Sequence, residues 1–408
     1  MNSLVLWGLV IMLSVVSCQT PDDNRDYAQV TEFAESQTNY TLQEVKDTSR
    51  IPRTLDKDNK LTTVGIYNWT SGFFAGNLWY IYQLTSEEKW KKEAIRWTEA
   101  LAPIQHWSGH HDVGFMIGCS YGNGYRLSEK EEYKEVLINA AQSLSKRFNP
   151  KVGLIKSWDY RKAWDGTTEW FYPVIIDNMM NLEILFEASI LSGNPKYYNI
   201  AIAHADATMK NHYRADYSCY HVVDYDEETG AVKDKATCQG FTDESSWARG
   251  QAWGLYGYVL CYRYTKDEKY LNFALNIADF ILNDDNLPDD LVPLWDYNVQ
   301  TPGFTPEWDY DASEYSVIPR DASAAAIVAS ALIEVSWNAE QGDKYYDQAV
   351  AMVNSLVDNY LADPKVNKYF ILDHSVGSIP HGVEKDVPLV YADYYFLEAL
   401  VRLQQTQQ

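Results

Sequence analysis

The chain has 408 residues, and its 34 basic and 57 acidic side chains give a formal net charge of −23 at pH 7. A surface this acidic argues against nucleic acid or an anionic membrane face as a partner. It also gives no long-range attraction for an anionic substrate, so such a ligand would need a local basic group. The five cysteines form no CxxC pair, and no His/Cys cluster has zinc-ligand spacing, so we expect no metal and no other cofactor.

The chain begins with an apolar segment, MNSLVLWGLVIMLSVVS, followed by Cys18. The sequence VVSC at its end resembles a bacterial lipoprotein cleavage box. We therefore expect residues 1–17 to be a signal peptide and residues 18–25 a tether that carries a lipid on Cys18. The protein would be exported, periplasmic or tethered to the outer membrane, and in contact with a membrane only through that lipid. A plain secretory signal is the alternative, and a spanning anchor is disfavoured because the run is shorter than roughly 20 residues.

Five segments along the chain share one pattern at a helix start. In each, an aromatic residue is followed four positions later by a small or aliphatic residue, one helical turn along the same face. The remaining positions are largely polar, which predicts amphipathic helices with one buried side. The segments are EEKWKKEAIRW, KEEYKEVLINA, NPKYYNIAIAH, DEKYLNFALNI and GDKYYDQAVAM, and residues 27–45 supply a sixth helix.

Six other segments, which alternate with these, are apolar nearly all round. They are NWTSGFFAGNLWYIYQL, HDVGFMIGCSYGNGYRL, IDNMMNLEILFEASIL, ARGQAWGLYGYVLCYRY, RDASAAAIVASALIEVS and YADYYFLEALVRL. Helices without a polar face belong inside a protein, and amphipathic helices belong outside. The alternation predicts an all-α fold, an (α/α)6 barrel of six inner and six outer helices, formed as one domain by residues 26–408. Length alone would suggest more domains, but the repeat overrides that estimate.

The inner helices of such a barrel run parallel, so their N-termini gather at one end. Glycines within them would permit close packing: Gly72, Gly76, Gly114, Gly118, Gly254 and Gly257. The long connections at 149–175, 213–247, 284–319 and 362–391 would form loops around that end. A hairpin is predicted over YHVVDYDEETGAVKDKAT, and the flanking Cys219 and Cys238 could pair in an oxidising compartment or remain free.

Polar residues recur at the predicted N-termini of the inner helices. They are Asn68, Trp69, His111, Asp112, Asp177, Asn178, Arg249, Gln251, Arg320, Asp321 and Asp393. Any single Asp or Asn at such a position is explained by helix capping. Six helix ends that converge on one cleft, with several tryptophans nearby in sequence, favour a sugar pocket instead, because sugar rings offer apolar faces and hydroxyl edges.

Two of these carboxylates, Asp112 and Asp177, begin neighbouring inner helices, a pattern that favours a glycosidase with one protonated acid and one ionised partner. Asp177 stands at the start of a very apolar run, IIDNMMN, where burial would raise its pKa. Arg249 and Trp253 share a helix face, so a cation and a ring could hold one ligand together. An ion pair between Arg249 and a neighbouring Asp is the alternative.

Four motifs, NWTSGFFAG, HHDVGF, IIDNMMN and WARGQAWGLYG, resemble glycoside hydrolase family 88, the unsaturated glucuronyl hydrolases. The similarity runs from about residue 25 to the end. It is looser to family 105, the unsaturated rhamnogalacturonyl hydrolases, which share the barrel. The resemblance implies that Asp177 is the general acid and base and Asp112 the second carboxylate. It further implies a list of residues near the substrate: Trp69, Trp158, His221, Gln239, Arg249 and Trp253.

The resemblance implies hydration of the C4=C5 bond of a 4,5-unsaturated uronic acid at the non-reducing end of lyase-generated oligosaccharides, without a cofactor. A Ser-x-x-Ser-x-Lys element accompanies sulfated substrates in that family; here Ser375 and Ser378 match, but Pro380 replaces the Lys, so a 6-sulfate preference is not predicted. Three alternatives remain: an unsaturated galacturonyl-rhamnose substrate, a non-catalytic sugar-binding lipoprotein, and an epimerase, for which only His111 of the expected His pair is found. The parent polysaccharide is not determined by the sequence.

Overall fold

The computed structural model describes residues 25–128, 130–299 and 301–406. The expected signal peptide and Cys18 lie outside these residues. Within the described part of the chain, no helix combines the length and apolar character needed to cross a membrane. In the same part, no group of three or more His, Cys, Asp or Glu side chains is arranged to hold a metal ion.

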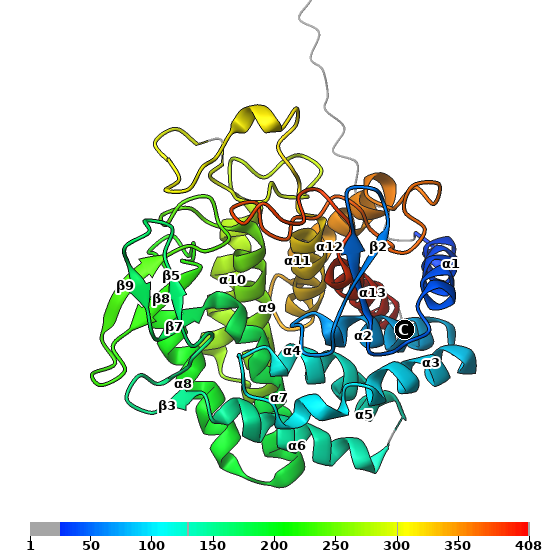
Figure 1. Ribbon diagram of the computed structural model, residues 1–408, viewed down its shortest axis with the longest axis horizontal. Helices are drawn as coiled ribbons and strands as arrows, with labels where there is room; N and C mark the ends of the chain where they lie inside the picture. The colour runs from blue at the N-terminus through cyan, green and yellow to red at the C-terminus, as the bar shows by residue number, and fades with distance from the viewer. Residues whose placement is uncertain (1–24, 129, 300, 407–408) are drawn as a thin grey trace, which may run out of the picture.

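Six apolar helical segments form a closed inner ring, in which each packs against the next and the last packs against the first (Figure 1). Their buried side chains, together with those of the surrounding helices, form one large core cluster that extends from Val30 to Leu403. The (α/α)6 barrel predicted from the alternation is confirmed. The inner helices are α2 (Ser71–Thr85), α4 (Val113–Ile117), α7 (Glu183–Ser192), α9 (Ala248–Thr265), α11 (Ala322–Ser336) and α13 (Val390–Thr406).

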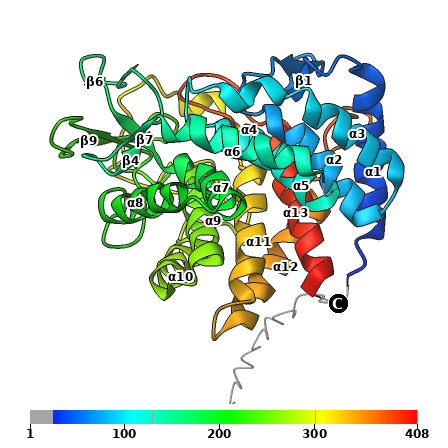
Figure 2. The ribbon, with the colours of Figure 1, turned by 90° about the horizontal axis from the view of Figure 1, so that it is seen from below.

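Six amphipathic helices surround this ring. Each has one apolar face, which it buries against the ring, and one polar face, which it turns to solvent. The repeated aromatic at the start of the five similar segments is buried in every case. Figure 2 shows α1 and α3 on one side of the barrel and α8 and α10 on the other. The outer helices are α1 (Ala28–Glu44), α3 (Glu88–Glu99), α6 (Glu131–Ser145), α8 (Pro195–Asn211), α10 (Glu268–Leu282) and α12 (Gly342–Asn359).

Two inner segments depart from a regular α-helix. The second is interrupted by a π-helix, Gly118–Gly122, between α4 and α5 (Asn123–Ser128). The third begins with a 3-10 helix, Ile176–Leu182. Within it, the side chain of Asn178 donates to the carbonyl of Ile155 at 2.7 Å, and that of Asn181 accepts from the amide of Phe115 at 2.8 Å. Residues three apart eclipse one another in a 3-10 helix, so both amides can reach neighbouring segments at once.

Glycine allows two of the inner helices to approach closely. A Cβ on Gly72 of α2 would lie 2.3 Å from the carbonyl oxygen of Met116, and a Cβ on Gly114 of α4 would lie 2.5 Å from the side chain of Asn181. The packing role predicted for the inner glycines is therefore correct at these positions. It is wrong for Gly118, where nothing lies within 4 Å of an added Cβ.

The N-terminal end of the inner ring carries the long connections and the strands (Figure 2). The hairpin predicted between Cys219 and Cys238 is present, and both cysteines are free and buried. Its first strand also pairs with β7, which the sequence did not predict. The strands are β1 (Ile51–Leu55), β2 (Leu61–Val64), β3 (Phe148–Asn149), β4 (Leu154–Ile155), β5 (Arg161–Lys162), β6 (Glu169–Trp170), β7 (Pro173–Ile175), β8 (Val222–Tyr225) and β9 (Val232–Ala236). Two short 3-10 helices, Ala102–His106 and Ala312–Glu314, complete the connections.

Candidate active site

A small polar cavity of about 130 Å³ opens at the N-terminal end of the inner ring. It brings together helix starts and long connections that are distant in sequence. Both carboxylates singled out in the sequence line it, and so do two tryptophans. The lining residues are Arg53, Trp69, His111, Asp112, Trp158, Ile175, Asp177, Gln239, Arg249, Gly377, Ser378, Val383, Glu384 and Tyr391.

Asp177 is the second residue of the 3-10 helix that precedes α7, and its side chain is only 12% exposed. Its Oδ2 atom is buried and has no hydrogen-bond partner among the described residues. Burial raises the pKa of this carboxyl from 3.8 to about 7; Arg249 opposes the rise and Asp112 adds to it. A carboxyl in this environment holds its proton near neutral pH and presents it to the cavity.

Asp112, immediately before α4, lies in a different electrostatic environment. Its Oδ2 is 3.1 Å from Nδ1 of His110, and its Oδ1 is 3.3 Å from Nε2 of His111. Burial disfavours the ionised form, but the two histidines and Arg147 outweigh it and lower the pKa of Asp112 below its usual value. The site therefore contains one carboxyl biased toward the protonated form and one biased toward the ionised form, as general acid-base chemistry requires.

His221, in the connection before β8, presents an N–H to Asp177. Its Nδ1 accepts from the backbone amides of Cys238 at 3.0 Å and Gln239 at 3.1 Å, so the ring proton lies on Nε2. That Nε2 is 3.8 Å from Oδ2 of Asp177 and has no hydrogen-bond partner among the described residues. Burial and the nearby Arg161 keep the pKa of His221 well below 6.5, so the ring is neutral.

Arg249 lines the cavity. It also forms an ion pair with a neighbouring aspartate, which was the expected alternative to ligand binding. Its Nη1 lies 2.8 Å from Asp321, and its Nη2 donates to the carbonyl of Gly377 at 2.7 Å. The guanidinium lies over the rings of Trp247, at 4.5 Å, and Tyr391, at 5.3 Å. These contacts hold a buried cation in one orientation at the wall of the cavity.

The structure places two of the predicted substrate contacts elsewhere. Trp253 is fully buried and packs against Phe115, at 5.2 Å between ring centroids, and Tyr395, at 5.3 Å, so the prediction that it holds ligand together with Arg249 is wrong. One helical turn separates the two residues, but the helix start faces the cavity whereas Trp253 lies inside the barrel. Ser375 is also fully buried and does not line the cavity, whereas Ser378 does.

Several polar residues at the helix starts serve the fold rather than the cavity. Asp321 accepts from the amides of Ser323 and Ala324 and so caps α11. Asp393 accepts from the backbone amides of Ile371 and Leu372. Helix capping therefore accounts for Asp321, as is common for Asp at a helix N-terminus. Support of the connection before α13 accounts for Asp393.

Three of the lining residues with polar side chains received no role from the sequence: Arg53, Glu384 and Tyr391. Arg53, on β1, pairs with Glu384 at 2.5 Å and also donates to the side chain of Asn68 at 3.0 Å. Partners more than 300 residues apart leave no local pattern. Tyr391 begins the last inner segment. Its position at a helix start was the one sequence feature that could have indicated a place in the site.

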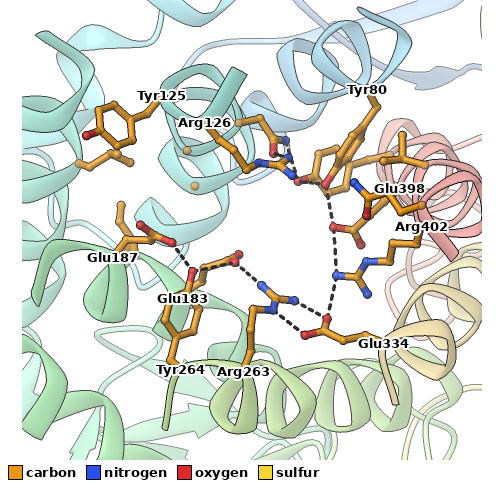
Figure 3. Close-up of a pocket in the computed structure, with 18 of the residues that line it drawn as sticks. Tyr80, Tyr125, Arg126, Glu183, Glu187, Arg263, Tyr264, Glu334, Glu398 and Arg402 are labelled. Atoms are coloured by element: carbon orange, nitrogen blue, oxygen red, sulfur yellow. Dashed lines mark hydrogen bonds and ion pairs between the residues drawn. The ribbon is translucent and has the colours of Figure 1, made fainter. Parts of the chain in front are cut away.

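A larger cavity, of about 610 Å³, lies at the opposite end of the barrel, where the inner helices end (Figure 3). Its charged side chains point toward one another. Arg263 pairs with Glu183 and Glu334, each at 2.6 Å, and Arg402 pairs with Glu334 at 3.0 Å. Burial acts to raise the pKa of Glu334, but the charges of Arg263 and Arg402 outweigh it and lower the pKa to about 2. These charged groups are held in ion pairs with one another, whereas Asp112 and Asp177 lie at the N-terminal end of the barrel.

Comparison with known proteins gives consistent matches. The model of Glycosyl Hydrolase Family 88 matches residues 34–260. The chain is 46% identical to an unsaturated glucuronyl hydrolase of Formosa agariphila, with 83% of this chain and 80% of that protein aligned. It is 33% identical to an unsaturated chondroitin disaccharide hydrolase of Streptococcus pneumoniae, over 85% and 84% of the two chains. It resembles the crystal structure of an unsaturated glucuronyl hydrolase specific for heparin, with a TM-score of 0.86, 44% identity, and 93% and 97% of the two chains covered.

Proposed function

Because the chain belongs to glycoside hydrolase family 88, it is a glycosidase, and we propose that Asp177 carries its chemistry. The reaction is hydration of the C4=C5 bond of a 4,5-unsaturated uronic acid at the non-reducing end of an oligosaccharide, which separates this uronyl residue from the neighbouring sugar. The relatives named for glucuronyl and chondroitin disaccharide substrates support this class. The single observation that carries the assignment is a buried carboxyl whose pKa is raised to about 7 beside an ionised carboxylate, in a cavity the size of one sugar ring.

The first step is transfer of the Asp177 proton to C4. The C4=C5 bond is a vinyl ether through the ring oxygen, so its electron pair forms the new C4–H bond and leaves an oxocarbenium-like centre at C5. Arg249 and the now ionised Asp177 lie within the same pocket, and Asp112 stays ionised between its two histidines. Negative charge beside the developing cation lowers the barrier, as electrostatic stabilisation does in other sites.

The second step is addition of water to C5. Ionised Asp177 takes the proton from this water, so the same carboxyl acts as acid and then as base. The product is a hemiketal at C5. Opening of its ring frees the oxygen at C1 as a hemiacetal, which collapses to an aldehyde and releases the neighbouring sugar with its hydroxyl group. Atoms balance with one water consumed, and no covalent enzyme intermediate is formed.

Replacement of Asp177 by Asn tests this assignment. With an unsaturated uronyl disaccharide, the wild-type protein is expected to remove the ultraviolet absorbance of the C4=C5 bond, and Asp177→Asn to lower kcat/KM by roughly 10²- to 10⁴-fold or more. The matched control is Glu228→Gln, which removes a carboxylate that is 81% exposed and is expected to leave turnover unchanged. A saturated disaccharide is expected not to be cleaved. Binding of the unsaturated disaccharide without any loss of absorbance would instead support a sugar-binding protein.

We also propose that the protein is exported as a lipoprotein with Cys18 as its lipidated residue. The apolar segment before Cys18 and the VVSC sequence support this placement. Fractionation of bacteria that produce the full chain tests it, because Cys18→Ser should move the protein from the membrane fraction to the soluble fraction. An unchanged distribution would contradict the proposal.

A further inference from the structure

The larger cavity, at the end of the barrel away from Asp177, has the size of a ligand site. Its volume of about 610 Å³ falls within the roughly 300–1,000 Å³ of pockets that enclose small molecules. Residues from all six inner segments line it. The ion pairs of Arg263 and Arg402 occupy only part of this lining, so the remaining groups decide what the space can hold.

Two glycines of the second inner segment keep this cavity open. Gly118 and Gly122 are the first and last residues of the π-helix, and both line the cavity. A Cβ added to either would meet nothing within 4 Å, so neither glycine is needed for close packing. Glycine is unfavourable inside a helix, and π-helices are rare and occur frequently at functional sites. The absence of two side chains therefore leaves room for a ligand.

Two charged side chains of opposite sign retain hydrogen-bonding capacity toward the cavity. Nη2 of Arg126 donates to the side chain of Asn123 at 2.6 Å, and its guanidinium forms no ion pair with a carboxylate of the described residues. The carboxylate of Glu187 accepts, within the same part of the chain, only from the hydroxyl of Tyr264. Figure 3 shows Arg126, Glu187 and the ring of Tyr125 around one open space. Free donors and free acceptors thus meet in this cavity.

The balance of charge around the cavity indicates a neutral ligand. Among the described residues, four glutamates and four lysine or arginine side chains line it, so their formal charges cancel. A simple anion would meet the carboxylates, and a simple cation would meet the guanidinium groups. A hydroxyl group both donates and accepts, so a molecule with several hydroxyls can accept from Arg126 and donate to Glu187.

Aromatic side chains complete the lining. The rings of Tyr125, Tyr264 and Trp337 belong to it, and such rings pack against the apolar faces of sugars. Tyr264 is held in place, because its ring stacks on Phe186 at 5.1 Å between centroids. We propose that this cavity is a second saccharide-binding site, which takes a neutral mono- or disaccharide. It lies apart from the catalytic carboxyls and takes no part in the hydration reaction.

Calorimetric titration of the full chain with neutral sugars tests the proposal. The probes are glucose, rhamnose, N-acetylglucosamine, N-acetylgalactosamine and lactose, and at least one is expected to bind saturably. Gly118→Leu, whose side chain would enter the cavity, should raise its Kd at least tenfold, whereas the small side chain of Gly118→Ala should change it less than threefold. Arg126→Gln should raise Kd roughly 10- to 100-fold, the effect of losing one charge-assisted hydrogen bond.

Turnover separates this site from the catalytic cavity. In all three variants, kcat and KM for an unsaturated disaccharide are expected to stay within twofold of the wild-type values. The matched control is Arg50→Gln, which removes an exposed guanidinium that lines neither cavity and should leave Kd unchanged. Circular dichroism and the unfolding midpoint establish that Gly118→Leu is folded, and Arg126→Gln decides the question if it is not.

Two results would overturn the proposal. One is the absence of saturable binding for every probe sugar. The other is a Kd that stays the same in Arg126→Gln and in folded Gly118→Leu, which would place the sugar elsewhere on the protein. Failure of the wild-type protein to turn over the unsaturated disaccharide would overturn the proposed function alone, because the titrations do not depend on turnover.

Discussion

At the scale of single residues, the two carboxyls of the site differ because their surroundings differ. Asp177 is buried at the start of an apolar 3-10 helix, its Oδ2 has no hydrogen-bond partner among the described residues, and its pKa is raised to about 7. Asp112 lies against two histidine rings, and its pKa is lowered. The separation follows from local contacts and therefore makes the pH dependence of activity predictable.

The first prediction concerns the alkaline limb of the pH profile. Protonated Asp177 is the active form, so kcat/KM for an unsaturated disaccharide is expected to fall as pH rises through about 7. Asp112 raises the pKa of Asp177 through its negative charge, so Asp112→Asn should shift this limb to lower pH as well as reduce the rate. A limb that moves to higher pH, or stays in place in the variant, would contradict the proposed coupling of the two carboxyls.

Sequence reasoning could identify Asp112, Asp177 and Trp69 because each stands in a motif at a helix start, and it reached Trp158 through the family resemblance. All four line the cavity. It could not identify Arg53, which reaches the site through a β-hairpin and pairs with a residue far along the chain. The helical spacing correctly predicted that Trp253 shares a helix face with Arg249. It did not predict how far from the cavity Trp253 would be buried. Depth depends on where the helix begins relative to the cavity, which a single sequence does not contain.

At the scale of elements, hydrophobic patterning was sufficient to predict all six outer helices and the order of the inner ones. The 3-10 start of the third inner segment and the π-helix in the second were not predictable, because both depend on contacts with other segments. The side chains of Asn178 and Asn181 bind backbone groups of residues 155 and 115, and these partners are defined only once the barrel closes.

A pair of glycine substitutions tests the packing of the inner ring. Gly72→Ala places a methyl group 2.3 Å from the carbonyl oxygen of Met116, so the α2–α4 contact must open; we expect a loss of about 2 kcal/mol or more in the free energy of unfolding. Gly118→Ala meets nothing within 4 Å and should be neutral or stabilising by about 0.5–1 kcal/mol, since alanine favours a helix. Urea unfolding of both variants measures the difference, and equal effects would contradict this packing.

At the scale of the whole molecule, the two ends of the barrel have different roles. The N-terminal end has buried polar atoms without hydrogen-bond partners among the described residues, such as Asp177 Oδ2 at the small cavity and His221 Nε2 behind it. The other end surrounds a larger cavity with paired charges (Figure 3). Unpaired groups are suited to bind a ligand, whereas paired groups hold helices together.

The charge network at that second end makes a stability prediction. Glu334 pairs with both Arg263 and Arg402, so Glu334→Gln is expected to lower the free energy of unfolding by about 3 kcal/mol near neutral pH. The folded pKa, lowered from 4.5 to about 2, means that this stabilisation is present above pH 4.5 and is lost as pH falls toward 2. Glu187→Gln, in the same cavity, should cost less than about 1 kcal/mol, because among the described residues its carboxylate accepts a hydrogen bond only from the hydroxyl of Tyr264.

Two results would contradict this account of the network. One is equal destabilisation by Glu334→Gln and Glu187→Gln, and the other is an effect of Glu334→Gln that persists unchanged at pH 2. Thermal or urea unfolding followed between pH 2 and 7 provides the comparison. Activity toward an unsaturated disaccharide should change little in Glu187→Gln, since this residue lies at the end of the barrel away from Asp177.

The central claim is that the protein adds a proton to C4 and hydroxide to C5 of an unsaturated uronyl ring. Turnover in D2O followed by NMR of the product tests it most directly. We expect one deuterium at C4 of the released uronate, no remaining C4=C5 bond, and product formation by Asp177→Asn that is slower by roughly 10²- to 10⁴-fold or more. A released uronate that keeps its C4=C5 bond and carries no deuterium at C4 would mean ordinary cleavage at the anomeric carbon and would contradict the mechanism.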